Sequence, residues 1–462
     1  MPKLTPRARH NLRRLPWIAA CTALVALPLH ADELPRRGLM GVQLGPVTAE
    51  LATELKLEKP DGFAVLGVFP DTAAAAAGLQ AQDVVVSVDG KPVATLEDGL
   101  NILRTLHAGD TAKLGIIRAG KPLDVPLTLR ERPRETSTDF EITYDCAGEP
   151  GHRVRTYVSR PKDDAKHPAI LLVQSLNPGP VEFSDPRMAN HPYKRLADEL
   201  TRAGFVVMRA EREGNGDSEG GDPRHPKLAN DVASFNAALT RLAAYDFVDA
   251  QRVYVFAQSS GAAIAPALAR NPAVDGVITY AAIARPWTEH LPETLAARWK
   301  LGMRDEAEIK ADLPKVKQFV QLCLVEGKNP QEVLSAHPEL TEITTGLVQD
   351  EFVMGSHYSF FHELAALDLG AQWKEVKVPV LALWGKSDFV ATRACSEFVA
   401  SSATAGGNAR ARFVALAGID HSYAPMEDAE ESFLAGFVGE FNPVIIKTIK
   451  QWVEETATNK AA

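Results

Sequence analysis

A regular alternation of short apolar runs and longer amphipathic stretches starts near residue 140 and continues almost to the end of the chain. Short runs rich in Val, Ile and Leu are typical of strands buried on both faces of a parallel sheet. Strands that alternate with helices indicate a doubly wound α/β fold. The predicted strands are 168–174, 205–208, 252–256, 277–280, 379–384 and 412–416, and the predicted helices include 192–203, 229–244 and 443–454.

One long stretch, Ala284–Lys374, interrupts this alternation with helical patterns. About ninety residues between two strands far exceed an ordinary connection, so we expect a cap over the sheet. Aromatic residues in a cap more often pack within it than contact a substrate, and both roles stay open here. The residues concerned are Trp287, Trp299, His357, Tyr358, Phe360 and Phe361.

The segment Arg36–Leu129 has a different character, because short apolar runs alternate with glycine turns such as Asp89-Gly90. It predicts a small β-rich domain with strands at 63–69, 84–88 and 112–117 and a helix at 96–106. The charged run that follows contains Pro133 and reads as a linker. The predicted organisation is a first domain at 36–131, a linker at 132–138 and an α/β domain at 139–458.

Several separated pieces of the first domain resemble, in order, a PDZ domain of the kind attached to bacterial envelope proteases. These pieces are Gly38–Val42, Val68–Ala73, Ala77–Leu79 and Asp83–Val93. The resemblance implies that the backbone N–H groups of Leu39, Met40 and Gly41 bind the terminal carboxylate of a peptide or protein, which pairs with the next strand. The alternative is a PDZ fold that serves only in packing.

The first 31 residues have the pattern of a signal peptide. Five Lys or Arg residues without an acidic residue precede the apolar stretch Leu15–Leu29, and Leu29-His30-Ala31 offers a cleavage site. The apolar stretch is too short and too interrupted by proline to span a bilayer, so we expect a periplasmic or secreted protein without a transmembrane span in the mature chain. A membrane anchor and lipid attachment at Cys21 are the alternatives.

Cleavage after residue 31 would remove those five positive charges and change the net charge from −9 to −14. An acidic chain without a basic patch repels phosphate backbones, so we expect no nucleic-acid partner. Three cysteines would remain, Cys146, Cys323 and Cys395, which leaves room for one disulfide of unassigned pairing. Their spacing matches no zinc motif, and we expect no metal or cofactor.

The predicted strand 252–256 leads into Ala257-Gln258-Ser259-Ser260-Gly261 and then into an alanine-rich predicted helix. This is the setting of a nucleophile elbow, in which a serine lies on a strained turn between small residues two positions before and after it. Gly261 satisfies the second position, and Ala257 stands where glycine is usual. If Ser260 were the nucleophile, Gln258 would occupy a position that needs a small residue, so Ser259 is the predicted nucleophile.

Two further residues follow predicted strands in the order that this architecture requires, first an acid and then a histidine. Asp388 comes just after strand 379–384, and His421 follows strand 412–416. His421 would accept the proton of Ser259, and Asp388 would orient the imidazole. Either residue alone would be an ordinary loop residue, but the ordered set predicts a catalytic triad.

Residues from about 137 to 456 resemble an α/β-hydrolase of the esterase, lipase and peptidase superfamily. The pieces that carry the resemblance are Ala169–Ser175, Arg209–Ser218, Ala257–Gly261, Leu383–Asp388 and Gly418–His421. It implies an oxyanion hole with one donor at the Ser260 N–H and a second in the loop after Val173. In that loop Gln174-Ser175 replaces the usual His-Gly.

We predict the Leu176 N–H as the second donor, with the Ser175 N–H close behind and the side-chain amides of Gln174 and Asn177 as alternatives. The whole set predicts a serine hydrolase that cleaves a small-molecule ester, thioester or amide through an acyl-Ser259 intermediate. A carboxylesterase is favoured over a peptidase by frequency within the superfamily. Acyl transfer to another acceptor is one alternative, and an inactive envelope scaffold is another, supported by Ala257 and by the changed loop.

Overall fold

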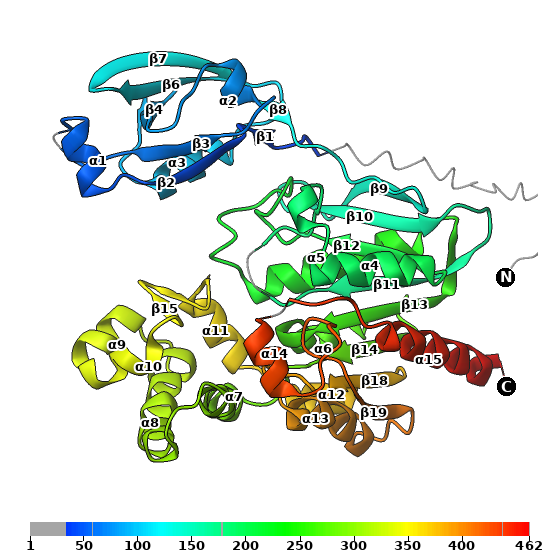
Figure 1. Cartoon of the computed structure of the whole chain (residues 1–462). Helices are drawn as coiled ribbons and strands as arrows, with labels where there is room; N and C mark the ends of the chain where they lie inside the picture. Colours follow the sequence, from blue (N-terminus) through cyan, green and yellow to red (C-terminus); the bar gives the residue numbers. More distant parts are fainter. Residues whose placement is uncertain (1–33, 58, 177–178, 437, 462) are drawn as a thin grey trace, which may run out of the picture. The chain divides into compact units, whose positions relative to one another are not determined.

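The computed structural model describes residues 34–57, 59–176, 179–436 and 438–461, which form two larger sheets, two small ones and the helices around them (Figure 1). The predicted signal peptide, Cys21 and Asn177 lie outside these residues. Among the described helices, none combines the length and apolar character needed to cross a bilayer.

The first domain is built on an antiparallel sheet in the order β2-β3-β4-β6-β7. The strands are β2 (Val42–Pro46), β3 (Phe63–Val68), β4 (Val84–Val88), β6 (Thr111–Arg118) and β7 (Lys121–Thr128), with β5 (Lys91–Pro92) beside β4. The helices are α1 (Ala49–Glu54), α2 (Ala73–Ala76) and α3 (Leu96–Leu103). The predicted strands are therefore present, and the predicted helix ends three residues early.

The two ends of this domain meet in a second pair of strands. β1 (Gly38–Leu39) and β8 (Arg130–Glu131) are antiparallel, and Leu39 lies opposite Arg130. The chain therefore leaves the domain next to the point where it enters.

The second domain contains an eight-stranded sheet in the order β19-β18-β14-β13-β11-β12-β10-β9. The strands are β9 (Phe140–Ala147), β10 (Val154–Pro161), β11 (His167–Val173), β12 (Val206–Ala210), β13 (Val248–Gln258), β14 (Gly276–Tyr280), β18 (Val380–Gly385) and β19 (Ala411–Leu416). From β12 to β19 every pairing is parallel, and β10 and β9 are added antiparallel. The carboxyl ends of the parallel strands thus share one edge.

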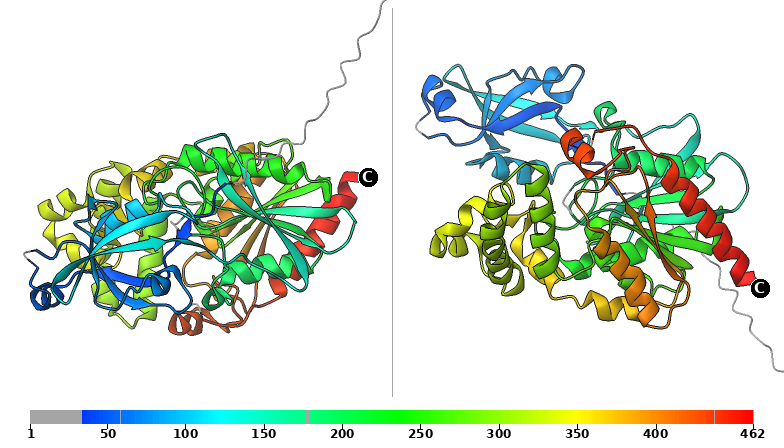
Figure 2. Two further views of the ribbon diagram at one scale, coloured as in Figure 1. Left: turned by 90° about the horizontal axis from the view of Figure 1, so that it is seen from above. Right: turned by 60° about the horizontal axis from the view of Figure 1, so that its bottom comes forward.

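Helices cover both faces of this sheet, as its continuous apolar strands predict. Along β13, Val253 and Val255 pack into one hydrophobic cluster with α5 (Leu228–Ala243) and α13 (Arg393–Ala405). The intervening Tyr254 and Phe256 pack on the other face, with α4 (Pro192–Arg202) and α15 (Val444–Ala461). In the right-hand view of Figure 2, α15 (red) and α13 (orange) lie on opposite sides of the sheet.

The residues between β14 and β18 form the expected helical cap. Its helices are α7 (Trp287–Leu301), α8 (Glu306–Phe319), which continues as a π-helical turn at Val320–Val325, α9 (Pro330–Ala336), α10 (Thr341–Thr344) and α11 (Tyr358–Ala365). A three-stranded sheet of two-residue strands, β15 (Val348–Gln349), β16 (Phe352–Val353) and β17 (Ser356–His357), was not expected. α12 (Leu369–Glu375) then leads back to β18.

Candidate active site

Ser259 lies directly after β13 in a backbone conformation that is rare outside glycine. Its φ is +54°, in the left-handed region, as expected for the strained turn of a nucleophile elbow. Gly261 is required nearby, because a Cβ there would lie 2.5 Å from the Gln174 carbonyl oxygen. The expected alanine-rich helix is shorter than predicted: a 3₁₀ turn at Ser259–Ala263 precedes the four-residue α6 (Ala265–Leu268).

Asp388 and His421 follow β18 and β19, so the parallel sheet brings both to the edge that carries Ser259. His421 Nδ1 lies 2.9 Å from Asp388 Oδ2. The other carboxylate oxygen of Asp388 accepts hydrogen bonds from the N–H groups of Val390 and Ala391, at 2.7 and 2.9 Å. The acid is therefore held at both oxygens, and its free rotation is removed.

Burial by itself would lower the pKa of His421, but the charge and the hydrogen bond of Asp388 raise it, and the net pKa lies above the ordinary value. The imidazole is also positioned through its main chain, because Gln258 Nε2 donates to the His421 carbonyl oxygen at 3.0 Å. Gln258 immediately precedes the serine. Sequence reasoning treated it as an elbow residue only and missed this contact.

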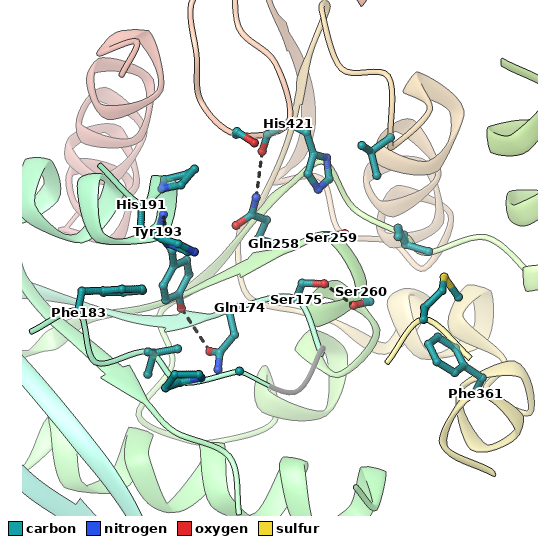
Figure 3. Close-up of a pocket in the computed structure, with 18 of the residues that line it drawn as sticks. Gln174, Ser175, Phe183, His191, Tyr193, Gln258, Ser259, Ser260, Phe361 and His421 are labelled. Carbon is teal, nitrogen blue, oxygen red and sulfur yellow. Dashed lines mark hydrogen bonds between the residues drawn. The ribbon is translucent and has the colours of Figure 1, made fainter. Parts of the chain in front are cut away.

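A cavity of about 580 Å³ contains both Ser259 and His421 in its wall (Figure 3). Its other described lining residues are apolar, aromatic or uncharged polar side chains, with no Asp, Glu, Lys or Arg among them. Phe183 stacks on His191 on one side, and the cap residues Trp287 and Phe361 meet edge to face on the other. These two cap aromatics thus face the cavity, whereas Trp299, His357 and Phe360 do not line it.

The loop after β11 approaches the turn that carries the two serines. The Leu176 N–H donates to Ser260 Oγ at 2.9 Å, and Ser175 Oγ lies 2.9 Å from the same oxygen. The predicted second oxyanion donor is therefore engaged by a side chain in this structure. Gln174 Oε1 accepts from the Tyr193 hydroxyl at 3.4 Å, and the Gln174 side-chain nitrogen is buried without a hydrogen-bond partner in the described structure.

Buried polar side chains hold the described part of this loop, here called the wall loop (residues 174–176 and 179–183). Arg212 donates to the Leu176 carbonyl oxygen at 2.8 Å, and Arg209 donates to the Val181 carbonyl oxygen at 2.7 Å. Glu211 accepts from the Val181 N–H at 3.0 Å. Burial raises the pKa of Glu211 to about 8, so this carboxyl is protonated at neutral pH.

Two of these groups are balanced by acids from other parts of the chain. Arg212 pairs with Asp231 of α5, and Arg209 pairs with Glu135 at 2.9 Å. Glu135 also accepts from the Phe183 N–H of the wall loop. Residues 209–212, part of the piece Arg209–Ser218 that carries the hydrolase resemblance, thus support the wall of the cavity.

No cysteine is among the described residues that line this cavity. Cys323 and Cys395 are buried free thiols. Within the described ranges, no group of three or more His, Cys, Asp or Glu side chains is arranged to hold a metal ion.

Comparison with known proteins agrees with both domains. A PDZ-domain family model matches residues 38–129. A probable periplasmic serine endoprotease, DegP-like, from Chlamydia trachomatis is 38% identical over 107 residues, which cover 23% of this chain and 22% of that protein. The periplasmic pH-dependent serine endoprotease DegQ from Escherichia coli is 35% identical over 108 residues, 23% of this chain and 24% of DegQ. The chain thus spans about a quarter of the length of these curated relatives.

Solved structures of esterases align with about two thirds of the chain at low identity. Est1E from Butyrivibrio proteoclasticus is 13% identical, with a TM-score of 0.41 over 68% of this chain and 99% of Est1E. Acetyl xylan esterase 1 from Thermoanaerobacterium sp. is 16% identical, with a TM-score of 0.38 over 71% of this chain and 86% of the esterase. A family model described as serine aminopeptidase, S33, matches residues 188–422. The chain therefore carries a PDZ domain and belongs to this α/β-hydrolase family of the serine aminopeptidase S33 type.

Proposed function

We propose that the protein is a serine hydrolase that cleaves uncharged esters through an acyl-Ser259 intermediate. The observation that carries the choice of substrate is the absence of charged side chains among the described residues that line the cavity. An aminopeptidase must bind the ammonium group of its substrate, and a buried ammonium needs a negative partner. A neutral, mostly apolar cavity favours an ester instead.

In this mechanism Ser259 Oγ attacks the ester carbonyl carbon while His421 Nε2 accepts its proton. Asp388 holds the other imidazole nitrogen as the N–H tautomer and stabilises the imidazolium. The Ser260 N–H donates to the oxygen that becomes negative. His421 then protonates the leaving alcohol, and water hydrolyses the acyl-enzyme by the same steps in reverse order.

The test compares p-nitrophenyl esters with aminoacyl p-nitroanilides, using the wild-type protein and Ser259→Ala. We expect the wild type to prefer the esters and the variant to lose at least about a thousandfold in kcat. Ser401→Ala, which changes an exposed serine of α13, is the control and should keep full activity. Equal rates in wild type and Ser259→Ala would remove Ser259 from the mechanism, and faster anilide cleavage would replace the ester by a peptide substrate.

Labelling with a fluorophosphonate separates an enzyme from an inactive scaffold. The probe reacts with an activated serine, so we expect it to label the wild type and not Ser259→Ala. If the wild type stays unlabelled at neutral pH, the scaffold alternative replaces the enzyme. Acyl transfer is tested by adding an alcohol acceptor and measuring ester formation against hydrolysis.

The PDZ domain is proposed to bind a peptide or protein C-terminus along β2. β2 is an edge strand that pairs with β3 alone in its sheet, and α3 lies against it. Leu39, Met40 and Gly41 immediately precede β2, and Gly41 has a φ of +79°. Binding of an apolar peptide with a free carboxylate should be lost when the same peptide is amidated; equal binding of the two would favour a packing role.

A periplasmic or secreted location is proposed from the signal-peptide pattern and from the periplasmic proteins that share the PDZ domain. The test is fractionation of cells that express the chain with and without residues 1–31. If the protein expressed with residues 1–31 is released by osmotic shock, and the protein expressed without them is not, the periplasmic location is supported. Retention in the membrane with acylation at Cys21 would establish the lipoprotein alternative.

A further inference from the structure

The residue after the proposed nucleophile carries a hydroxyl that is held in place from two sides. Ser260 Oγ accepts the Leu176 N–H at 2.9 Å and lies 2.9 Å from Ser175 Oγ. Ser175, Ser259 and Ser260 all line the same cavity. Figure 3 shows the side chains of Ser175 and Ser260 facing each other. Ser260 is 7% exposed, so its position is set by protein contacts rather than by solvent.

The hydroxyls of Ser175 and Ser260 together carry one hydrogen more than their mutual contact uses. Each serine hydroxyl has one hydrogen and can accept at two lone pairs. The contact between Ser175 and Ser260 uses one of the two hydrogens, whichever residue donates. The hydrogen bonds among the described residues give neither hydroxyl another acceptor. Within the described part of the chain, one O–H at the cavity wall therefore has no acceptor and can donate to a ligand.

We propose that this O–H is the second donor of the oxyanion hole, so that Ser260 supplies both its N–H and its hydroxyl to the substrate carbonyl oxygen. This inference rests on the proposed serine-hydrolase function. As Ser259 Oγ bonds to the carbonyl carbon, the π electron pair moves to the carbonyl oxygen and His421 takes the serine proton. The Ser260 hydroxyl keeps its own proton and stabilises the new charge by hydrogen bonding alone.

The surroundings of Ser260 make this hydroxyl a better donor than an isolated one. The Leu176 N–H donates to its oxygen and draws electron density from it, and hydrogen bonds in such a chain strengthen one another. Leu176 thus acts through Ser260 as a positioning residue. The competing arrangement has the Leu176 N–H leave Ser260 and bind the substrate directly.

Removing the Ser260 hydroxyl distinguishes these arrangements, because the change frees the Leu176 N–H. If the amide were the donor, Ser260→Ala would keep or increase kcat. If the hydroxyl is the donor, kcat for p-nitrophenyl butyrate should fall at least about tenfold with little change in KM, since the contact is made in the transition state. Ser260→Thr, which keeps a hydroxyl, should recover most of the loss.

Ser175→Ala should have the smaller effect, because Ser260 then still has its own hydrogen to donate. The double variant should be no slower than Ser260→Ala alone, because the two hydroxyls share one function. Ser402→Ala is the matched control: Ser402 is also 7% exposed but lies on α13, and its variant should keep the wild-type kcat. Thermal unfolding of each variant checks that the fold is kept.

A trifluoromethyl ketone gives a second readout, because its adduct with Ser259 carries the same oxyanion. Its inhibition constant should rise in Ser260→Ala by about the same factor as kcat falls. Fluorophosphonate labelling with an undiminished kcat in Ser260→Ala would overturn the hydroxyl assignment alone. A wild type that no fluorophosphonate labels would overturn the proposed function and this inference together.

Discussion

Gly261 shows how closely the turn around Ser259 is packed. A Cβ at this position would lie 2.5 Å from the Gln174 carbonyl oxygen and 2.9 Å from that of Val173, and neither backbone atom can move cheaply. Gly261→Ala should therefore destabilise the protein by about 2 kcal/mol and lower kcat by displacing Ser259. Gly221→Ala is the control, because a Cβ there meets nothing within 4 Å. Equal unfolding midpoints for the two variants in urea would contradict this packing argument.

The Asp388–His421 contact predicts the pH dependence of the reaction. His421 must be neutral to accept the serine proton, and Asp388 raises its pKa above the ordinary value. The ratio kcat/KM should thus rise with pH through a pKa above 6.5. Asp388→Asn should move this acidic limb to lower pH and reduce kcat by about 10⁴-fold. If the acidic limb of the kcat/KM profile lay at the same pH in wild type and in Asp388→Asn, a group other than His421 would be responsible for it.

Glu211 makes stability, rather than activity, depend on pH. Its folded-state pKa is raised from 4.5 to about 8, so the unfolded chain loses this proton at lower pH than the folded protein. Stability should fall as pH rises through this window, by about 1.4 kcal/mol per pKa unit. Glu211→Gln keeps an oxygen for the Val181 N–H and should unfold at higher temperature than wild type at pH 8, but not at pH 4. If the unfolding temperatures of Glu211→Gln and wild type differed equally at pH 4 and pH 8, Glu211 would not be the group that makes stability depend on pH.

At the residue scale, sequence could place Ser259, Asp388 and His421 after strands, because the apolar pattern of each strand is easily recognised. It could not show that Ser260 Oγ would engage the Leu176 N–H, or that Gln258 would hold the His421 main chain. These contacts join segments that are far apart in sequence. They depend on side-chain rotamers that only packing decides.

The described residues of the wall loop contain no helix or strand, and side chains that form buried ion pairs bind its backbone. Arg209 is 1% exposed and bonds both Glu135 and the Val181 carbonyl oxygen. Arg209→Met should leave Glu135 buried without its cation and cost about 3–5 kcal/mol. Adding Glu135→Gln should recover part of this loss, as measured by denaturant unfolding. A double variant less stable than Arg209→Met alone would show that the pair is not coupled.

At the element scale, continuous apolar runs such as β13 and β18 were predicted within a few residues, because strands buried on both faces have a strong signal. β9 and β10 were missed, since polar residues interrupt their patterns at the antiparallel edge of the sheet. The strands β15 to β17 are two residues each, too short for any periodicity. α6 is shorter than its alanine-rich sequence suggested, because the 3₁₀ turn takes its first residues.

At the scale of the whole molecule, the residues that flank the PDZ domain also belong to the charge networks of the second domain. Arg36, before β1, pairs with Glu182 at 2.7 Å and with Asp217 at 2.6 Å, and all three are buried. Glu135, after β8, pairs with Arg209. The domain boundary predicted at residue 139 therefore separates Arg36 and Glu135 from the residues with which they pair. The sequence could not reveal this, because charge pairing between distant segments leaves no local pattern.

Two shortened chains test whether the flanking segments are required. A chain of residues 139–462 lacks Arg36 and Glu135 and so removes these charged partners from Glu182, Asp217 and Arg209, which we expect to be destabilising. The second chain keeps residues 34–39 and 130–462 and joins them by an Asn-Gly turn, which the pairing of Leu39 with Arg130 allows. We expect the second chain to be soluble, to unfold cooperatively and to be labelled by a fluorophosphonate, and the first to aggregate. If the chain that starts at 139 were equally stable and equally labelled, the flanking charges would be dispensable to the hydrolase domain.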